Sequence, residues 1–172
     1  MRNLKQFMLL LMVVSLVTIT GCKSDDDGGN PGAAGAGVIT AKVNGVLFTS
    51  MEIASGATLV NAGTAQVLIL RGSDPSGKAF TLTINGYEGV GTYEIDGNGI
   101  GFSTALYNEV NVSNPSASQS WLAPYDTTVN GTILISEASA TNFKGTFEFV
   151  AENSEDNSLK TITEGSFNLN KV

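Results

Sequence analysis

The side-chain types that most enzymes use for catalysis are scarce in this chain of 172 residues. It contains no histidine and one cysteine, Cys22, so the usual general base, the Ser-His-Asp and Cys-His arrangements and the commonest metal ligand are all missing. The sixteen aspartates and glutamates could still form a carboxylate pair about 5–10 Å apart, as glycoside cleavage requires. None of them lies in a distinctly apolar segment, the usual setting of a catalytic acid. We therefore predict that the protein is not an enzyme and carries no cofactor and no metal.

A candidate binding site is the long break in the strand pattern at residues 111–128. This segment contains the only tryptophan, Trp121, and Tyr125 four residues later. Long loops without internal structure are often functional, and the two rings could form a stacking surface for a sugar. The alternative is that Trp121 anchors the loop against the core, as large aromatic side chains usually do. The exposure of the Trp121 ring separates these two interpretations.

Two short polar motifs each have a chemical and a structural interpretation. The run Asp96-Gly97-Asn98-Gly99 offers oxygen atoms at the alternate spacing that begins a calcium-binding loop. It lacks the later carboxylate of the full motif, and a hairpin turn explains it more simply. The run Asp126-Thr127-Thr128 matches the short acceptor pattern of bacterial O-glycosylation, which predicts Thr127 as a modified residue.

The N-terminal residues predict where the protein is located. Two basic residues, Arg2 and Lys5, precede a mostly apolar run at residues 7–17, and the segment ends at Gly21-Cys22. This order is typical of a secretory signal peptide, and the apolar run is shorter than the ~20 residues of a membrane-spanning helix. A cysteine directly after small residues resembles the bacterial lipoprotein signal, which implies cleavage after residue 21 and lipidation of Cys22. An ordinary free thiol after a generic signal peptide is the alternative.

The residues after Cys22 predict a flexible connection to a folded domain. Lys23-Ser24-Asp25-Asp26-Asp27 resembles the export signal of surface-exposed lipoproteins, with a solvated acidic linker as the alternative. The glycine- and alanine-rich stretch that follows has nothing to bury. We therefore predict a signal peptide (1–21), a lipidated cysteine with a tether (22–37) and a folded domain (38–172). The expected location is the outer membrane, with the domain facing the cell exterior.

The charge balance restricts the partners of the domain. Removal of residues 1–21 takes away two of the nine basic residues and none of the sixteen acidic ones, which leaves seven against sixteen and a net charge of −9. This balance disfavours nucleic acid, which proteins bind through lysine and arginine. It also disfavours electrostatic adhesion to anionic lipid, so the lipid anchor is the only membrane attachment that we predict.

The hydrophobic pattern predicts an all-β domain. From Val38 onward apolar and polar residues mostly alternate, as in residues 80–85 and 147–151, which is typical of half-buried strands. Val43-Asn44-Gly45-Val46 predicts a hairpin with a type I′ turn. Residues 53–65 are rich in glycine and alanine, and we predict them to be irregular. About eight to ten short strands with frequent turn signals favour an antiparallel two-sheet β-sandwich, with a closed β-barrel as the alternative.

One local pattern occurs four times: a glycine, a hydroxyl residue, an apolar residue, any residue and an apolar residue. The four copies begin at Gly91, Gly131, Gly145 and Gly165, at irregular spacings that exclude a solenoid or a propeller. We interpret each copy as the start of a strand, with a permissive glycine at the bend and the hydroxyl side chain pointing outward.

These segments, with residues 39–45 near the start and 162–167 near the end, resemble an uncharacterised family of small lipoproteins of Bacteroidota, particularly flavobacteria, classed as a domain of unknown function. The resemblance covers residues 38–172 and rests on strand starts and turns, so it implies the fold more than an activity. The family supplies no catalytic or binding residues. We expect a surface-anchored lipoprotein whose domain is a non-enzymatic binding module for a glycan or an envelope protein. A structural or adhesive envelope protein without a specific ligand is the alternative.

Overall fold

The computed structural model describes residues 33–98 and 102–172. In this part the chain is built from strands, with two short 3₁₀ helices, η1 (Glu52–Ala54) and η2 (Pro115–Ala117), between them. The prediction of an all-β domain is therefore confirmed. The strands are β1 (Val38–Val43), β2 (Val46–Thr49), β3 (Ser55–Ala62), β4 (Ala65–Ser73), β5 (Lys78–Asn85), β6 (Gly91–Asp96), β7 (Thr104–Glu109), β8 (Gln119–Ala123), β9 (Val129–Ala138), β10 (Asn142–Glu152) and β11 (Leu159–Asn170).

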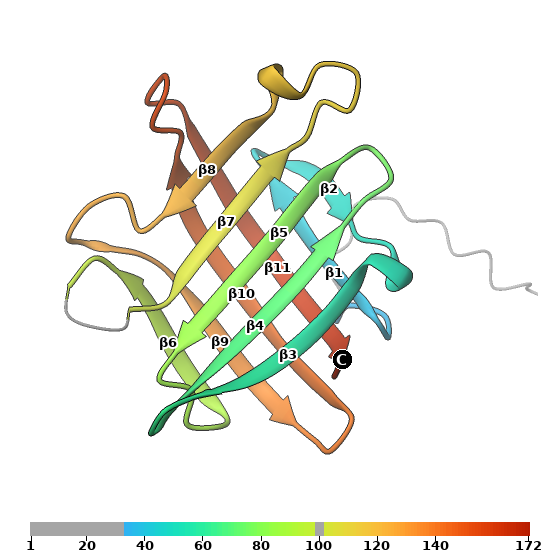
Figure 1. The fold of residues 1–172 in the computed structure, drawn as a ribbon, viewed down its shortest axis with the longest axis vertical. Coiled ribbons are helices and arrows are strands. Elements are labelled where there is room, and N and C mark those ends of the chain that lie inside the picture. Colours follow the sequence, from blue (N-terminus) through green and yellow to red (C-terminus); the bar gives the residue numbers. More distant parts are fainter. Residues whose placement is uncertain (1–32, 99–101) are drawn as a thin grey trace, which may run out of the picture.

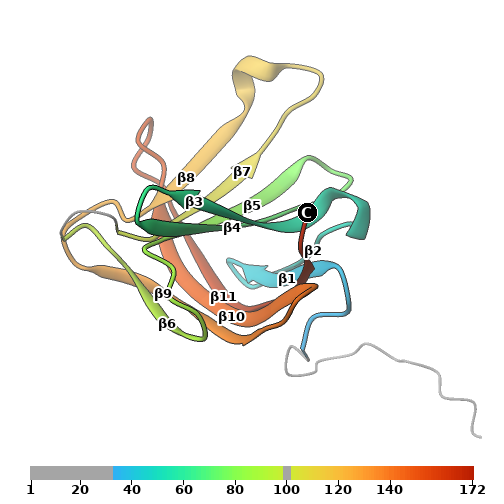
Figure 2. The same ribbon diagram turned by 60° about the horizontal axis from the view of Figure 1, so that its bottom comes forward.

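The strands form one curled antiparallel sheet in the order β2-β1-β11-β10-β8-β7-β5-β4-β3, with β9 between β10 and β6 (Figure 1). The predicted sandwich of two separate sheets is not confirmed, because β10 shares one edge between two partners. It pairs with β9 from Phe143 to Phe149 and with β8 at Glu152. The two halves of the curled sheet face each other across the core, as Figure 2 shows.

The sheet is open and does not form the closed barrel considered as the alternative. Its outer strands are β2, β3 and β6, and near β3 the end of the chain bridges the curl. Ala57 forms an isolated bridge with Lys171, and the backbone N–H of Val172 donates to the carbonyl oxygen of Ala57 over 3.0 Å. The remainder of β3, from Thr58 to Ala62, pairs with β4 alone among the described residues.

The core is a continuous cluster of apolar side chains between the two halves, with Phe80 near its centre. The Phe80 ring lies edge-on to Phe48 at 4.8 Å between centroids, and 5.0 and 5.6 Å from Tyr107 and Phe147. These rings come from β2, β5, β7 and β10, so a single aromatic cluster holds both halves together. Aromatic pairs at this spacing contribute about 0.5–1.5 kcal/mol each beyond the area they bury.

Two expectations about local structure have opposite outcomes. Asn44 and Gly45 both have positive φ, 48° and 81°, and connect β1 to β2, so the predicted hairpin turn is confirmed. The prediction that residues 53–65 are irregular is wrong, since Ser55–Ala62 is strand β3. All eight residues of β3 pair with β4 without a register shift, so pairing across a tight turn outweighs a composition that is unfavourable for strands.

Of the four strand starts predicted from the repeated glycine pattern, one is confirmed. Gly91 is the first residue of β6, whereas Gly131, Gly145 and Gly165 lie inside β9, β10 and β11. A Cβ atom at any of these three positions would collide with backbone of the neighbouring strand. Glycine is needed there because the strands bend and approach closely, and register shifts occur in the β6–β9, β9–β10 and β10–β11 pairs.

Candidate functional site

The structure does not form an aromatic surface from Trp121 and Tyr125. Trp121 lies in β8, inside the segment predicted as a long loop, and only 5% of it is exposed. Its indole N–H donates to the hydroxyl of Ser158 over 3.0 Å, and its ring is 5.8 Å from Tyr107. Tyr125 follows the end of β8 and is 39% exposed. The geometry therefore agrees with the alternative in which Trp121 anchors the chain to the core.

Trp121 belongs to a polar cluster at one end of the core. The Glu109 carboxylate accepts hydrogen bonds from the Tyr107 hydroxyl at 2.9 Å and the Lys160 ammonium at 3.1 Å, and this ammonium lies 4.4 Å from the centre of the Trp121 ring. Burial, with the nearby Glu109 charge, raises the pKa of Tyr107 well above its usual range. Burial also acts to raise the pKa of Glu109, but its hydrogen bonds from Tyr107 and Lys160 lower it overall. Every group is satisfied, so the cluster is suited to stability.

The two short polar motifs pack against each other. The side-chain amide of Asn98 donates to the carbonyl oxygen of Thr127. The Asp126 carboxylate accepts hydrogen bonds from the backbone N–H and the hydroxyl of Thr128, at 2.8 and 2.7 Å, which lower the pKa of Asp126. Thr127 is exposed in this turn, so its predicted glycosylation stays a prediction. Gly99 and Cys22 lie outside the described residues.

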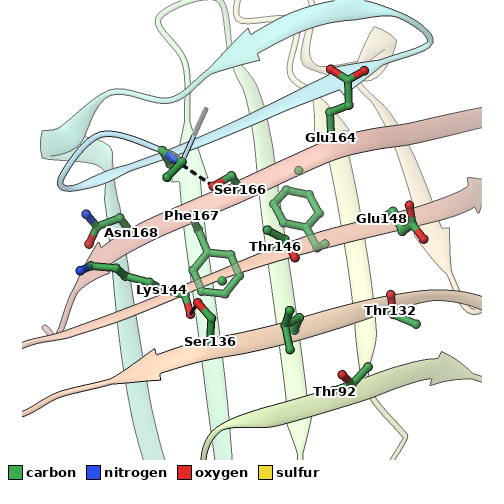
Figure 3. A pocket seen from close by; sticks show the side chains of 16 residues that line it. Thr92, Thr132, Ser136, Lys144, Thr146, Glu148, Glu164, Ser166, Phe167 and Asn168 are labelled. Atoms are coloured by element: carbon green, nitrogen blue, oxygen red, sulfur yellow. Dashed lines mark hydrogen bonds between the residues drawn. The ribbon is translucent and has the colours of Figure 1, made fainter. Parts of the chain in front are cut away.

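An open groove of about 730 Å³ lies on the outer face of β6, β9, β10 and β11. Figure 3 shows this face, with polar side chains from successive strands pointing into the groove. One wall is formed by Ala33 and Ala34, just before β1. The backbone N–H of Ala34 donates to the Ser166 hydroxyl over 2.9 Å, so the last residues of the predicted tether are fixed against the sheet.

Two of the residues that line the groove are glycines inside the neighbouring strands β10 and β11. Gly145 and Gly165 line it, and each pairs across the strands with a phenylalanine, Phe167 and Phe147. A Cβ atom on Gly145 would lie 2.5 Å from the Phe167 ring, and one on Gly165 would lie 2.7 Å from the Phe147 ring. The two buried rings fill the core-side space that a side chain at either glycine would take.

The four hydroxyl residues of the repeated sequence pattern all line this groove: Thr92, Thr132, Thr146 and Ser166. Thr146 and Ser166 are paired directly across β10 and β11, while Thr132 is opposite Glu148 across β9 and β10. Leu134 of β9 pairs with both Thr92 and Thr146, so an apolar side chain separates these two hydroxyls across the groove. The sequence pattern contained this signal, since it places each hydroxyl on the outward face.

The charges around the groove are mixed and mostly paired. The Lys144 ammonium forms a salt bridge with Glu137 at 2.9 Å, and Glu164 forms one with Lys42 at 2.7 Å. Glu148 is exposed and forms no ion pair with another described residue. The groove therefore presents hydroxyls and a carboxylate, groups that hydrogen-bond neutral polar ligands.

Within residues 33–98 and 102–172, no three histidine, cysteine, aspartate or glutamate side chains gather as a metal site would require. No helix in the same ranges is long and apolar enough to cross a membrane.

Searches of the curated proteins and of the solved structures gave no match. A family model does match residues 36–169, which span all eleven strands except the last residue of β11. The chain therefore belongs to the family described as Domain of unknown function (DUF6252).

Proposed function

We propose that the protein is a surface-anchored lipoprotein whose domain binds a glycan in the outer-face groove without catalysing a reaction. The observation that carries the binding role is that Thr92, Thr132 and Thr146 all line one open groove. Ser166 lines it as well, but this residue is buried and its hydroxyl accepts a hydrogen bond from Ala34. Sugar hydroxyls donate and accept hydrogen bonds, as do threonine and serine hydroxyls, and carboxylates such as that of Glu148 accept them. An open groove across four strands suits an elongated ligand better than a small one.

The glycan proposal is tested by removing two groove hydroxyls without changing side-chain shape. A variant with Thr132→Val and Thr146→Val keeps β-branched residues in β9 and β10, so the strands should be retained. Each lost hydrogen bond is worth about 0.5–1.5 kcal/mol, so we expect glycan affinity to fall by about tenfold or more. Binding is measured on a glycan array and by calorimetry with the full-length protein purified from membranes.

The control for this variant is Thr49→Val, which removes an exposed hydroxyl from β2, away from the groove, and should bind like wild type. Unchanged binding by the double variant would contradict the groove site. If the wild-type protein bound no glycan, the structural or adhesive role would be favoured instead.

The lipoprotein part of the proposal rests on Gly21-Cys22 after the apolar run. Two or three acyl chains would hold the protein at the membrane, since each buried methylene contributes about 0.8 kcal/mol. We expect Cys22→Ser to release the protein or to leave it as an uncleaved precursor, as measured by fractionation and mass spectrometry. Protease added to intact cells should remove the wild-type domain. Normal membrane retention of Cys22→Ser would contradict lipidation.

A further inference from the structure

Strand β3 has an outer edge without the features that normally prevent strands of different chains from pairing. Natural edge strands are protected by charged residues, proline, bulges or short length. Strand β3 is eight residues long and pairs with β4 without a bulge. No charged residue and no proline occurs between Glu52 and Arg71. Leu59 and Val60 are 38% and 43% exposed.

The hydrogen bond from Val172 to Ala57 shows which backbone groups of β3 point to this edge. The carbonyl oxygen of Ala57 accepts from outside the β3–β4 pair, so the backbone groups of Ala57 point away from β4. In an antiparallel strand the backbone groups of alternate residues point to the same side. The N–H and C=O groups of Leu59 and Asn61 therefore also point outward, beyond the part of β3 that the end of the chain covers.

We propose that the β3 edge pairs with the β3 edge of a second copy of this chain, antiparallel and with Val60 on the two-fold axis. In this register Leu59 of each copy faces Asn61 of the other, and the two pairs exchange four backbone hydrogen bonds. Val60 faces Val60 in a non-hydrogen-bonded pair, and Thr58 faces Ala62. A two-fold contact of this kind is the commonest form of self-association.

The charge distribution supports a second copy as the occupant of this edge. The chain has a net charge of −7, which opposes close approach of most parts of its surface to another copy. The segment from Ile53 to Leu70 is uncharged, so the two edges meet without placing like charges opposite each other. Anchoring of both copies to one membrane, which the proposed function implies, would raise their local concentration.

The first test is disulfide cross-linking of a Val60→Cys variant in the full-length chain. Opposed Cα atoms in a non-hydrogen-bonded pair lie about 4.5 Å apart, within the range that a disulfide spans. We expect a mild oxidant to give a product of twice the monomer mass that a reductant reverses. The matched control is Val90→Cys, a valine that is 62% exposed between β5 and β6. Equal cross-linking of the two variants would overturn the proposal.

A second test separates specific pairing from local unfolding of β3. Thr58 and Ala62 lie on the same face of β3 as Val60 and face each other across the proposed axis. Two variants are made in the Val60→Cys background. The first carries Thr58→Lys and Ala62→Glu, which places opposite charges across the interface. The second carries Thr58→Lys and Ala62→Lys, which places like charges there. We expect cross-linking to be several-fold faster in the first than in the second. No difference between them would contradict this register.

Discussion

Replacement of Gly145 by alanine is expected to lower the free energy of unfolding by about 3 kcal/mol. The added methyl group would collide with the carbonyl oxygen of Leu134 in β9 and with the ring of Phe167 in β11. Both neighbours belong to strands that are hydrogen-bonded to β10, so relief of the collision requires the sheet itself to move. We expect the midpoint of thermal unfolding to fall by about 10 °C.

The control for this prediction is Gly91→Ala, in the first copy of the same sequence pattern. A Cβ atom there would meet nothing within 4 Å, and Gly91 is not among the glycines with positive φ. Alanine at such a position restricts the unfolded chain and stabilises by about 0.4–1 kcal/mol. The free energy of unfolding should therefore fall in Gly145→Ala and rise in Gly91→Ala. Equal effects in thermal or denaturant unfolding would show that Gly145 is not held in a close approach.

The second large effect is a loss of stability at alkaline pH that depends on Tyr107. The pKa of its hydroxyl is raised in the folded protein, first by burial and then by its hydrogen bond to Glu109, whereas in the unfolded chain it is about 10. The stabilising contribution is therefore complete below pH 10 and is lost as the pH rises above that value. The loss is at most about 1.4 kcal/mol per pH unit, so the free energy of unfolding should fall progressively between pH 10 and pH 12.

This dependence is measured by denaturant unfolding between pH 8 and pH 12, comparing wild type with Tyr107→Phe. The variant loses a hydrogen bond and should be less stable at pH 8, but its stability should fall less steeply above pH 10. Tyr125→Phe is the control, because Tyr125 is 39% exposed. Parallel pH profiles for Tyr107→Phe and wild type would contradict the role of Tyr107.

The features that could be predicted from the sequence are those with local causes. The Asn44-Gly45 turn requires positive φ at both residues, which these two residues tolerate well. The alternation in Phe80–Asn85 places every second side chain in the core, and this segment is β5. Strand β3 could not be predicted in the same way. Its eight residues form a strand because β4 lies beside it, and a composition of small residues does not contain that information.

Part of the candidate site could be predicted from the sequence. The repeated pattern indicated that Thr92, Thr132, Thr146 and Ser166 point outward, but the pairing order of β6, β9, β10 and β11 is needed to bring them together. The pattern also suggested bends at the glycines. Their position inside three strands depends on contacts with Phe147, Phe167 and neighbouring backbone. For Trp121, the sequence left two interpretations open, and its contacts with Tyr107, Ser158 and Lys160 favour the anchoring role.

The pairing of β1 with β11 has a consequence for the order in which the domain can form. Val38 pairs with Asn168 and Val43 with Ile162, so the first strand finds its main neighbour more than a hundred residues later. Contacts over such separations form late and slowly, because a long loop must close first. During synthesis β1 has only β2 to pair with until β11 emerges. The sheet therefore cannot be completed until nearly all of the chain has been made.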